Sequence, residues 1–212
     1  MSDGTDWHAW HDGYEDASSD LSHRLEVVRT AVRDWADVRP WGRSRVISIC
    51  AGQGHDLVGA LTDHPRRAEV TGLLVDLDPA NVRAAQGSLD SAGLTGVRAV
   101  VGDAGRAEVY RSAVPADLVL VCGVFGNVPD DDVARTVRAL PQLCADGATV
   151  VWTRHRRPPD LTPALREWFA RAGFAERSFT SPGAGRLAVG VHVLTGPTAP
   201  FDPHQELFAF VG

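Results

Sequence analysis

Residues 45–54 read Arg45-Val46-Ile47-Ser48-Ile49-Cys50-Ala51-Gly52-Gln53-Gly54, a β-branched run that ends in a glycine turn. Asp76 follows 22 residues after Gly54, at the end of a second apolar run. Open α/β sheets bind nucleosides with this pattern, because the glycines let the backbone approach the ligand and the acid accepts hydrogen bonds from a ribose diol. The stretch therefore predicts a nucleoside site after the first strand.

Strand and helix patterns alternate along the chain. The predicted strands are 46–50, 70–75, 97–101, 117–122, 149–153, 174–180 and 187–194. The predicted helices run from 20 to about 39, from about 54, from 79 to 92, around 106–112, from about 130 and from 161 to 172. The last two strands follow each other directly. This order predicts an α/β fold, a doubly wound, mostly parallel seven-stranded sheet that ends in an antiparallel hairpin.

Capping residues set the expected helix starts. Ser19, Asp78 before Pro79, and Thr162 before Pro163 are each predicted to precede the first turn of a helix. Domains of about 100–200 residues are common, so the 212 residues predict a single domain. We expect an N-terminal lid and helix at 1–40, a core sheet at 45–195, and a tail at 196–212 in which 207–211 is a candidate edge strand.

The composition of the chain limits the classes of molecule that it is expected to bind. The formal net charge of −6 argues against a nucleic-acid surface, which depends on clustered cationic side chains, and favours a small-molecule substrate. No apolar run approaches the ~18 residues of a membrane span, and the polar, acidic start is unlike a secretory signal, so we expect a cytoplasmic protein without membrane contact. All 21 basic residues are arginine, which excludes lysine-based covalent catalysis.

The cysteines and histidines show no metal-ligand spacing. Three cysteines are too few and too far apart for a disulfide framework or a zinc site, although Cys50 and Cys122 both end strands and could pair under oxidation. Five histidines are scattered singly, so no metal is expected. They are His8, His23, His64, His192 and His204.

The ends of four predicted strands carry the candidate ligand-binding residues. The strands end at Gly52, at Asp76, at Asp103 and at Cys122-Gly123. Because the carboxyl ends of parallel strands lie along one edge, these residues are expected to meet there. This edge, beside the switch point at the first strand, is the predicted binding site.

In this order and spacing, residues of about 45–195 resemble the class I S-adenosylmethionine-dependent methyltransferases. The resemblance implies S-adenosyl-L-methionine as cofactor and S-adenosyl-L-homocysteine as product. It implies that the turn passes under the methionyl part, Asp76 binds the ribose hydroxyls, and Asp103 with Ala104 meets the adenine. The implied cofactor-binding residues are Ala51, Gly52, Gln53, Gly54, Asp76, Leu77, Asp103, Ala104, Cys122, Gly123 and Val124, with Tyr14 and Arg24 from the N-terminal region.

Two positions depart from the family pattern. Ser48 stands where an acid is usual, and Cys50 stands where the first turn glycine is usual. We expect the backbone at Cys50 to adopt a conformation that suits a residue with a Cβ.

The aromatic N-terminus and the first helix leave alternatives open. Trp7, Trp10, His11 and Tyr14 are interpreted as a lid over the active-site edge, the alternative being a frayed tail. Arg24 either faces solvent or reaches the cofactor carboxylate. The run 154–157 is either a solvated loop or an anchor for an anionic acceptor.

The predicted reaction is transfer of a methyl group to an oxygen or nitrogen atom of a small molecule. His11 and His155 are the candidate general bases and Asn127 is the candidate orienting group, although each histidine alone also fits a structural role. One alternative is an NAD-dependent dehydrogenase, whose fingerprint wants a glycine where Leu57 stands. Another is a non-catalytic nucleoside-binding protein of the same fold. The sequence is also compatible with a homodimer.

Overall fold

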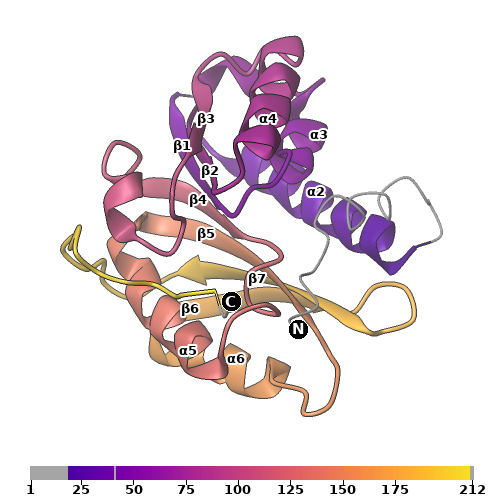
Figure 1. Ribbon diagram of the computed structural model, residues 1–212, viewed down its shortest axis with the longest axis vertical. Helices are drawn as coiled ribbons and strands as arrows, with labels where there is room; N and C mark the ends of the chain where they lie inside the picture. The colour runs from indigo at the N-terminus through magenta and orange to yellow at the C-terminus, as the bar shows by residue number, and fades with distance from the viewer. Residues whose placement is uncertain (1–18, 41, 211–212) are drawn as a thin grey trace.

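The computed structural model describes residues 19–40 and 42–210, which form a seven-stranded sheet between two layers of helices (Figure 1). The strand order is β3-β2-β1-β4-β5-β7-β6. Strands β1 to β5 are parallel, and β7 runs antiparallel to both β5 and β6. The strands are β1 Ser44–Ile49, β2 Val70–Asp76, β3 Val97–Val101, β4 Ala116–Val121, β5 Cys144–His155, β6 Phe174–Thr180 and β7 Leu187–Leu194. The predicted fold class is confirmed.

In the part of the chain that the structure describes, one α-helix precedes β1, and four α-helices and three short 3₁₀ helices lie between the strands. The α-helices are α2 Asp20–Val38, α3 His55–Leu61, α4 Pro79–Ser91, α5 Asp130–Ala139 and α6 Thr162–Arg171, and the 3₁₀ helices are η2 Arg67–Glu69, η3 Ala107–Tyr110 and η4 Leu140–Gln142. Within the described residues, no helix is both long and apolar enough to cross a membrane.

The helix starts follow the predicted caps with one exception. Ser19 Oγ accepts the Ser22 N–H at 3.1 Å, and Asp78 Oδ1 accepts the Ala80 N–H at 2.7 Å. Thr162 is not the cap of α6 but its first residue, because Asp160 Oδ1 already accepts the Thr162 N–H at 2.9 Å. A carboxylate two residues earlier supplies the acceptor that the threonine was expected to supply.

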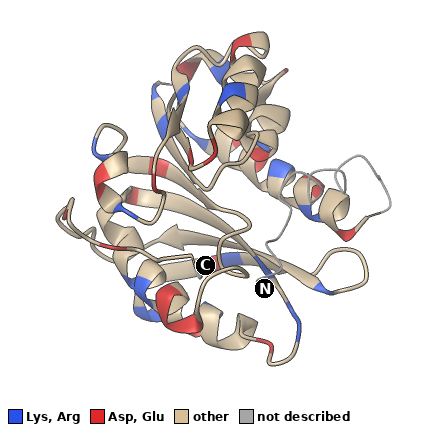
Figure 2. Cartoon of the chain, in the orientation of Figure 1, with Lys and Arg blue, Asp and Glu red and all other residues tan. Residues whose placement is uncertain are grey.

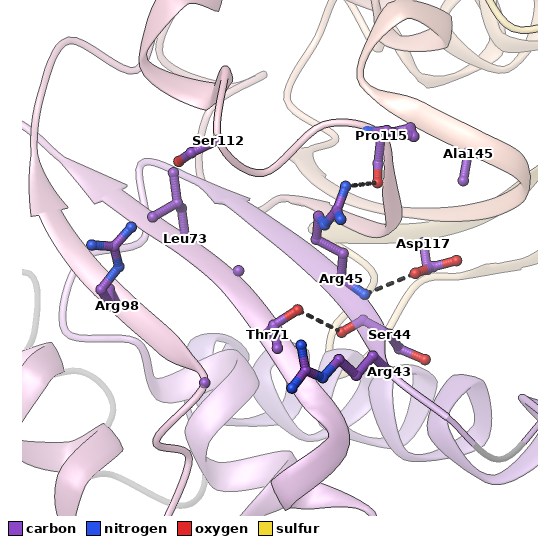
Figure 3. Close-up of a pocket in the computed structure, with 12 residues that line it drawn as sticks. Arg43, Ser44, Arg45, Thr71, Leu73, Arg98, Ser112, Pro115, Asp117 and Ala145 are labelled. Atoms are coloured by element: carbon purple, nitrogen blue, oxygen red, sulfur yellow. Dashed lines mark hydrogen bonds between the residues drawn. The ribbon is translucent and has the colours of Figure 1, made fainter.

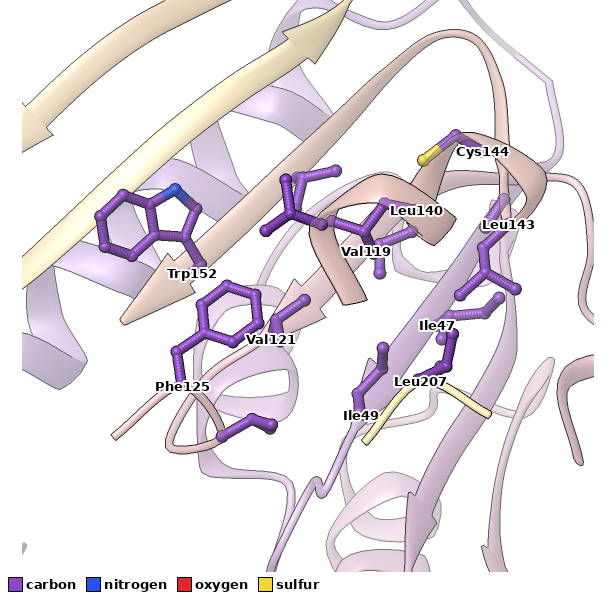
Figure 4. Close-up of a cluster of buried hydrophobic side chains, with 14 of the residues drawn as sticks. Ile47, Ile49, Val119, Val121, Phe125, Leu140, Leu143, Cys144, Trp152 and Leu207 are labelled. Atoms are coloured by element: carbon purple, nitrogen blue, oxygen red, sulfur yellow. The ribbon is translucent and has the colours of Figure 1, made fainter. Parts of the chain in front are cut away.

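The two faces of the sheet bury separate cores. Helices α2, α3 and α4 cover one face, and α5 and α6 cover the other (Figure 1). Trp152, Phe125 and Val121 meet at the α5–α6 side of the sheet (Figure 4), where Trp152 also stacks on Phe169 with ring centroids 5.9 Å apart. Burying one such large side chain contributes about 1.5–3 kcal/mol, so this cluster fixes the carboxyl half of the sheet.

The C-terminal segment does not form the expected edge strand over residues 207–210. It makes one isolated bridge, between Arg106 and Glu206, and the Leu207 N–H donates to Gly105 O at 2.7 Å. The Thr136 hydroxyl of α5 donates to Leu207 O at 2.8 Å. Leu207 and Phe208 are buried in the core between η3 and α5. Side-chain burial in this gap, away from the sheet edges β3 and β6, decides the path.

Candidate active site at the carboxyl edge of the sheet

The order of the strands changes direction at β1. The chain first adds β2 and β3 on one side of β1 and then places β4 on its other side. Ligands of open α/β sheets bind at such a switch point, outside the carboxyl ends of the strands. The predicted site residues that follow β1, β2, β3 and β4 therefore lie along one edge, as the sequence predicts.

The turn after β1 uses left-handed backbone conformations. Gly52 and Gly54 have φ angles of 55° and 77°, and Cys50 has a φ of 53°. The expectation of an ordinary backbone at Cys50 is wrong: the cysteine adopts the conformation that favours glycine, at a cost of about 1–2 kcal/mol. The Ala51 N–H donates to Val75 O at 2.9 Å, which fixes the turn to β2. The hydrogen bond between Ala51 and β2 thus holds the strained Cys50 in the turn at the predicted ligand site.

Asp76, at the end of β2, is built into the same turn. Its Oδ2 accepts the Gly52 N–H at 2.8 Å, and its Oδ1 accepts the Asp78 N–H at 3.0 Å and the Asn81 side-chain amide at 3.3 Å. Asp76 is half-buried. A carboxylate accepts at about four lone-pair positions, which leaves capacity for a diol.

Asp103 and Ala104 follow β3 on the same edge. Asp103 is exposed, and its Oδ1 accepts the Gly105 N–H at 2.9 Å. Burial raises the pKa of the Cys50 thiol, and the carboxylates of Asp76 and Asp103 raise this pKa further. The structure thus brings both acids close to Cys50, as the predicted site requires. The thiol stays protonated and is unsuited to act as a nucleophile.

The loop after β4 forms the other wall of the edge. The Gly123 N–H donates to the Thr153 hydroxyl of β5 at 2.9 Å, and Gly123 has a φ of 78°. The Asn127 side-chain amide donates to Gly123 O at 2.6 Å, while the Asn127 N–H donates to Val124 O at 2.9 Å. Asn127 is exposed, whereas Cys122 and Val124 are buried. Asn127 therefore orders the loop itself.

Arg24 of α2 points inward and does not face solvent, since only 5% of it is exposed. It lies near Asp56 of α3 and Cys122: burial raises the pKa of the Cys122 thiol, the Asp56 carboxylate raises it too, and the Arg24 guanidinium opposes this. The solvent-facing alternative is thus wrong. Arg24 of α2 and Asp56 of α3 therefore both lie close to Cys122, which follows β4 at the switch point.

His155, the last residue of β5, lies against the loop after β4. A Cβ at Gly126 would lie 3.0 Å from His155 Cδ2, so a larger residue at this position would displace the ring by a few tenths of an ångström. Burial lowers the pKa of His155, and the nearby Arg154 and Arg157 lower it further. The Arg157 N–H donates to His155 Nδ1 at 3.3 Å. The imidazole is neutral near pH 7 and lies beside the predicted site.

Arg154 is a structural residue and not part of a solvated loop or an anion anchor. Its guanidinium is buried, pairs with Asp130 at 3.0 Å and donates to Phe125 O. Arg156 pairs with Asp160 at 2.9 Å. Only Arg157 of this run is exposed without an ion pair to the described residues. The remaining predicted site residues, His11 and Tyr14, lie outside the described residues.

Sequence reasoning missed three residues that shape this edge. Asn81 and Thr153 hold Asp76 and Gly123, and Asp56 pairs with Cys122. Asn81 could have been found from its place in the first turn after the Asp78 cap. Thr153 and Asp56 carry no such signal, because their partners lie on other elements. In the described part of the chain, the three cysteines are free and no group of three metal-binding side chains occurs.

Residues 21–174 match a family model described as "Putative methyltransferase". The chain belongs to this methyltransferase family. Its fold is that of the class I S-adenosylmethionine-dependent methyltransferases. No curated protein matches the sequence of this family member.

Solved structures share the fold at low sequence identity. An O-methyltransferase family protein from Burkholderia thailandensis gives a TM-score of 0.64 and 19% identity, over 89% of this chain and 60% of that chain. Magnesium protoporphyrin IX methyltransferase of Synechocystis PCC 6803, solved with bound S-adenosylmethionine, gives a TM-score of 0.68 and 13% identity, over 91% and 92%. A [4+2]-cyclase gives a TM-score of 0.57 and 14% identity, over 81% of this chain and 82% of the cyclase chain. Identities this low show the fold alone, and the fold does not fix the reaction. The chain spans 60% of the length of the Burkholderia protein.

Proposed function

We propose that the protein transfers the methyl group of S-adenosylmethionine to an oxygen or nitrogen atom of a small molecule. The observation that carries the proposal is the pair of acids at the ends of two neighbouring parallel strands, Asp76 at the end of β2 and Asp103 after β3, beside the left-handed glycine turn that Asp76 holds through the Gly52 N–H. Family membership favours this reaction over the dehydrogenase alternative, as does the buried Leu57 where a third glycine would be needed.

The nucleoside end of the site suits the cofactor. Asp76 pairs with Val101 in the register of β2 and β3, and Leu77 follows directly. Leu77 and Val101 are 67% and 54% exposed, so both apolar side chains are accessible to a ligand at this edge. The Asp76 carboxylate would accept the ribose hydroxyls, the two apolar side chains would flank the adenine, and Asp103 would accept from its amino group.

The methionyl end would lie between the glycine turn and the loop at Gly123. The left-handed glycines bring the backbone close to the ligand without a Cβ. Arg24, buried at the switch point, is the cation placed to meet the cofactor's carboxylate. Tyr14 and the lid remain predictions.

Holding the acceptor in position accounts for most of the reduction of the reaction barrier. The bound sulfonium supplies an activated methyl group, so the protein must hold the acceptor in line at roughly 3–3.5 Å and exclude water. His155, neutral because its pKa is lowered, would take the acceptor's proton at Nδ1. Its 3.3 Å bond from the Arg157 N–H occupies that lone pair and would have to break first. His11, the other candidate base, lies outside the described residues and stays a prediction.

Calorimetry with S-adenosylhomocysteine and with NAD tests the cofactor. We expect saturable binding of S-adenosylhomocysteine and none of NAD at the same concentrations, and the reverse result would overturn the proposal. A metabolite screen for a mass gain of one methylene in the presence of S-adenosylmethionine then tests the reaction. Binding without turnover on any acceptor would favour a non-catalytic nucleoside-binding protein.

A further inference from the structure

A cavity of about 520 Å³ lies at the amino-terminal ends of the strands, at the opposite end of the sheet from the candidate active site. Its walls come from the starts of β1, β2 and β3 and from the segment before β4 (Figure 3). β1 has six residues, so the two ends of the sheet are about 16 Å apart. The cavity is therefore separate from the cofactor edge.

The short β3–β4 connection explains why this surface is open. η3 has only four residues, too few to cover the amino halves of β1, β2 and β3 on the face that it shares with α5 and α6. Arg45, Thr71 and Arg98 lie on this face, because side chains alternate along a strand and their neighbours Ile47, Leu73 and Val100 belong to the α5–α6 core. Polar side chains thus take the place of a covering helix.

Strand register brings these residues together. Arg45 is paired with Thr71 across β1 and β2, and Leu73 is paired with Arg98 across β2 and β3. Figure 3 shows Thr71 and Leu73 between Arg98 on one side and Arg45 on the other, with Arg43 beside Thr71. Three guanidinium groups from separate positions therefore border one cavity.

The positive charge of this cavity is not balanced by the residues around it. Among the described residues that line it, Asp117 is the only acid, and this carboxylate already accepts from the Arg39 guanidinium and from the Arg45 N–H at 2.7 Å. Arg43 and Arg98 are exposed and make no ion pair or hydrogen bond with the described residues. Acidic and basic residues are interspersed over the rest of the chain (Figure 2), whose net charge is −6. A local surplus of cations in an acidic protein indicates an anionic ligand.

We infer that this cavity binds a small molecule that carries a phosphate or diphosphate group. Guanidinium groups match phosphate oxygens in pairs, and the hydroxyls of Thr71 and Ser112 add donors in the same lining. A tetrahedral phosphate accepts from donors on several sides, whereas a carboxylate offers two oxygens in one plane. The volume is in the range of small-molecule pockets, ~300–1,000 Å³. Arg45, held through Nη1 to Val114 O at 2.9 Å, is the fixed cation, and Arg43 and Arg98 close on the ligand.

Titration calorimetry with inorganic pyrophosphate at low ionic strength tests this site. We expect saturable binding to the wild-type protein and at least tenfold weaker binding to Arg43→Gln and to Arg98→Gln. Arg83→Gln is the matched control, because Arg83 is an exposed arginine on α4, on the other face of the sheet. Its affinity for pyrophosphate should stay within twofold of wild type. Thermal melting of each variant checks folding, which these exposed positions should leave intact.

Four results would overturn the inference. They are no saturable binding to the wild-type protein, equal weakening by Arg83→Gln, binding of the dicarboxylate malonate as tight as that of pyrophosphate, and competition between pyrophosphate and S-adenosylhomocysteine. The last would place the anion at the cofactor edge. Unchanged S-adenosylhomocysteine affinity in Arg98→Gln would support two independent sites.

Discussion

At the scale of single residues, the Asp76 carboxylate has two roles: it holds the turn after β1, and it is the proposed acceptor for the ribose hydroxyls. It holds the turn through Gly52 and the start of α4 through Asp78 and Asn81, so the group offered to the ribose cannot rotate away. Cys50 bears the strain of the same turn. A pre-oriented acceptor loses little freedom when the ligand binds, which favours affinity.

Asp76→Ala should weaken S-adenosylhomocysteine binding by about 1.5–3 kcal/mol, or roughly 10- to 150-fold, because hydrogen bonds to a charged group are lost. The measurement is titration calorimetry, with Asp63→Ala, an exposed acid after α3, as the control. A melting curve of Asp76→Ala separates lost affinity from lost turn structure. Wild-type affinity in a folded Asp76→Ala protein would remove Asp76 from the site.

At the scale of elements, β5 and β7 form the pH-sensitive part of the core. The Trp152 Nε1–H donates to His192 Nδ1 at 3.1 Å, and the His192 ring stacks on Phe169 at 4.3 Å. Burial lowers the pKa of His192 from 6.5 to about 4, more than the nearby Glu176 carboxylate can offset. The neutral imidazole is therefore part of the folded core.

The unfolded chain binds a proton at His192 more readily than the folded chain does. The stability that the neutral His192 ring contributes is therefore complete above pH 6.5 and is lost as the pH falls toward 4. The shift corresponds to about 3 kcal/mol. We expect His192→Gln to flatten the fall in unfolding free energy between pH 6.5 and 4, measured by urea denaturation. His204→Gln, at an exposed position, should keep the wild-type slope. Parallel pH curves for all three proteins would contradict the assignment.

The C-terminal segment is the element that closes the core between η3 and α5. Leu207 is fully buried there, whereas Phe210 is 45% exposed. Leu207→Ala should lower the unfolding free energy by about 2–5 kcal/mol through a cavity, and Phe210→Ala by about 1 kcal/mol or less. Denaturant unfolding measures both. A smaller effect for Leu207→Ala than for Phe210→Ala would show that the segment does not pack as described.

At the scale of the whole molecule, the sheet presents a different chemistry at each end. Asp76, Asp103 and the exposed Leu77 and Val101 lie at the carboxyl ends, and Arg43, Arg45 and Arg98 border the cavity at the amino ends. A ligand that binds only the folded state stabilises all of it, since both cores share the one sheet.

Saturation with S-adenosylhomocysteine at about 100 times its Kd should add about 2.7 kcal/mol to the unfolding free energy and raise Tm by roughly 5–10 °C. NAD at the same concentration should leave Tm unchanged. Differential scanning fluorimetry with the wild-type chain and Asp76→Ala makes the comparison. A shift of the same size in both proteins would place the nucleoside elsewhere.

The sequence alone determined the features that depend on local pattern. The strands at 97–101, 174–180 and 187–194 were predicted with the bounds that the structure has, because apolar runs between turn residues are local signals. The Asp78 cap and the meeting of Asp76 and Asp103 at one edge follow from the same reasoning, since parallel strands end together.

Only the tertiary structure decided the features whose partners lie far along the chain. Cys50 takes a left-handed backbone because the turn is bonded to β2, and Arg24 turns inward beside Asp56 and Cys122. Residues 207–210 leave the sheet for a gap between η3 and α5. Spacing and propensity carry no information on such contacts, because each depends on how distant elements fill the same space.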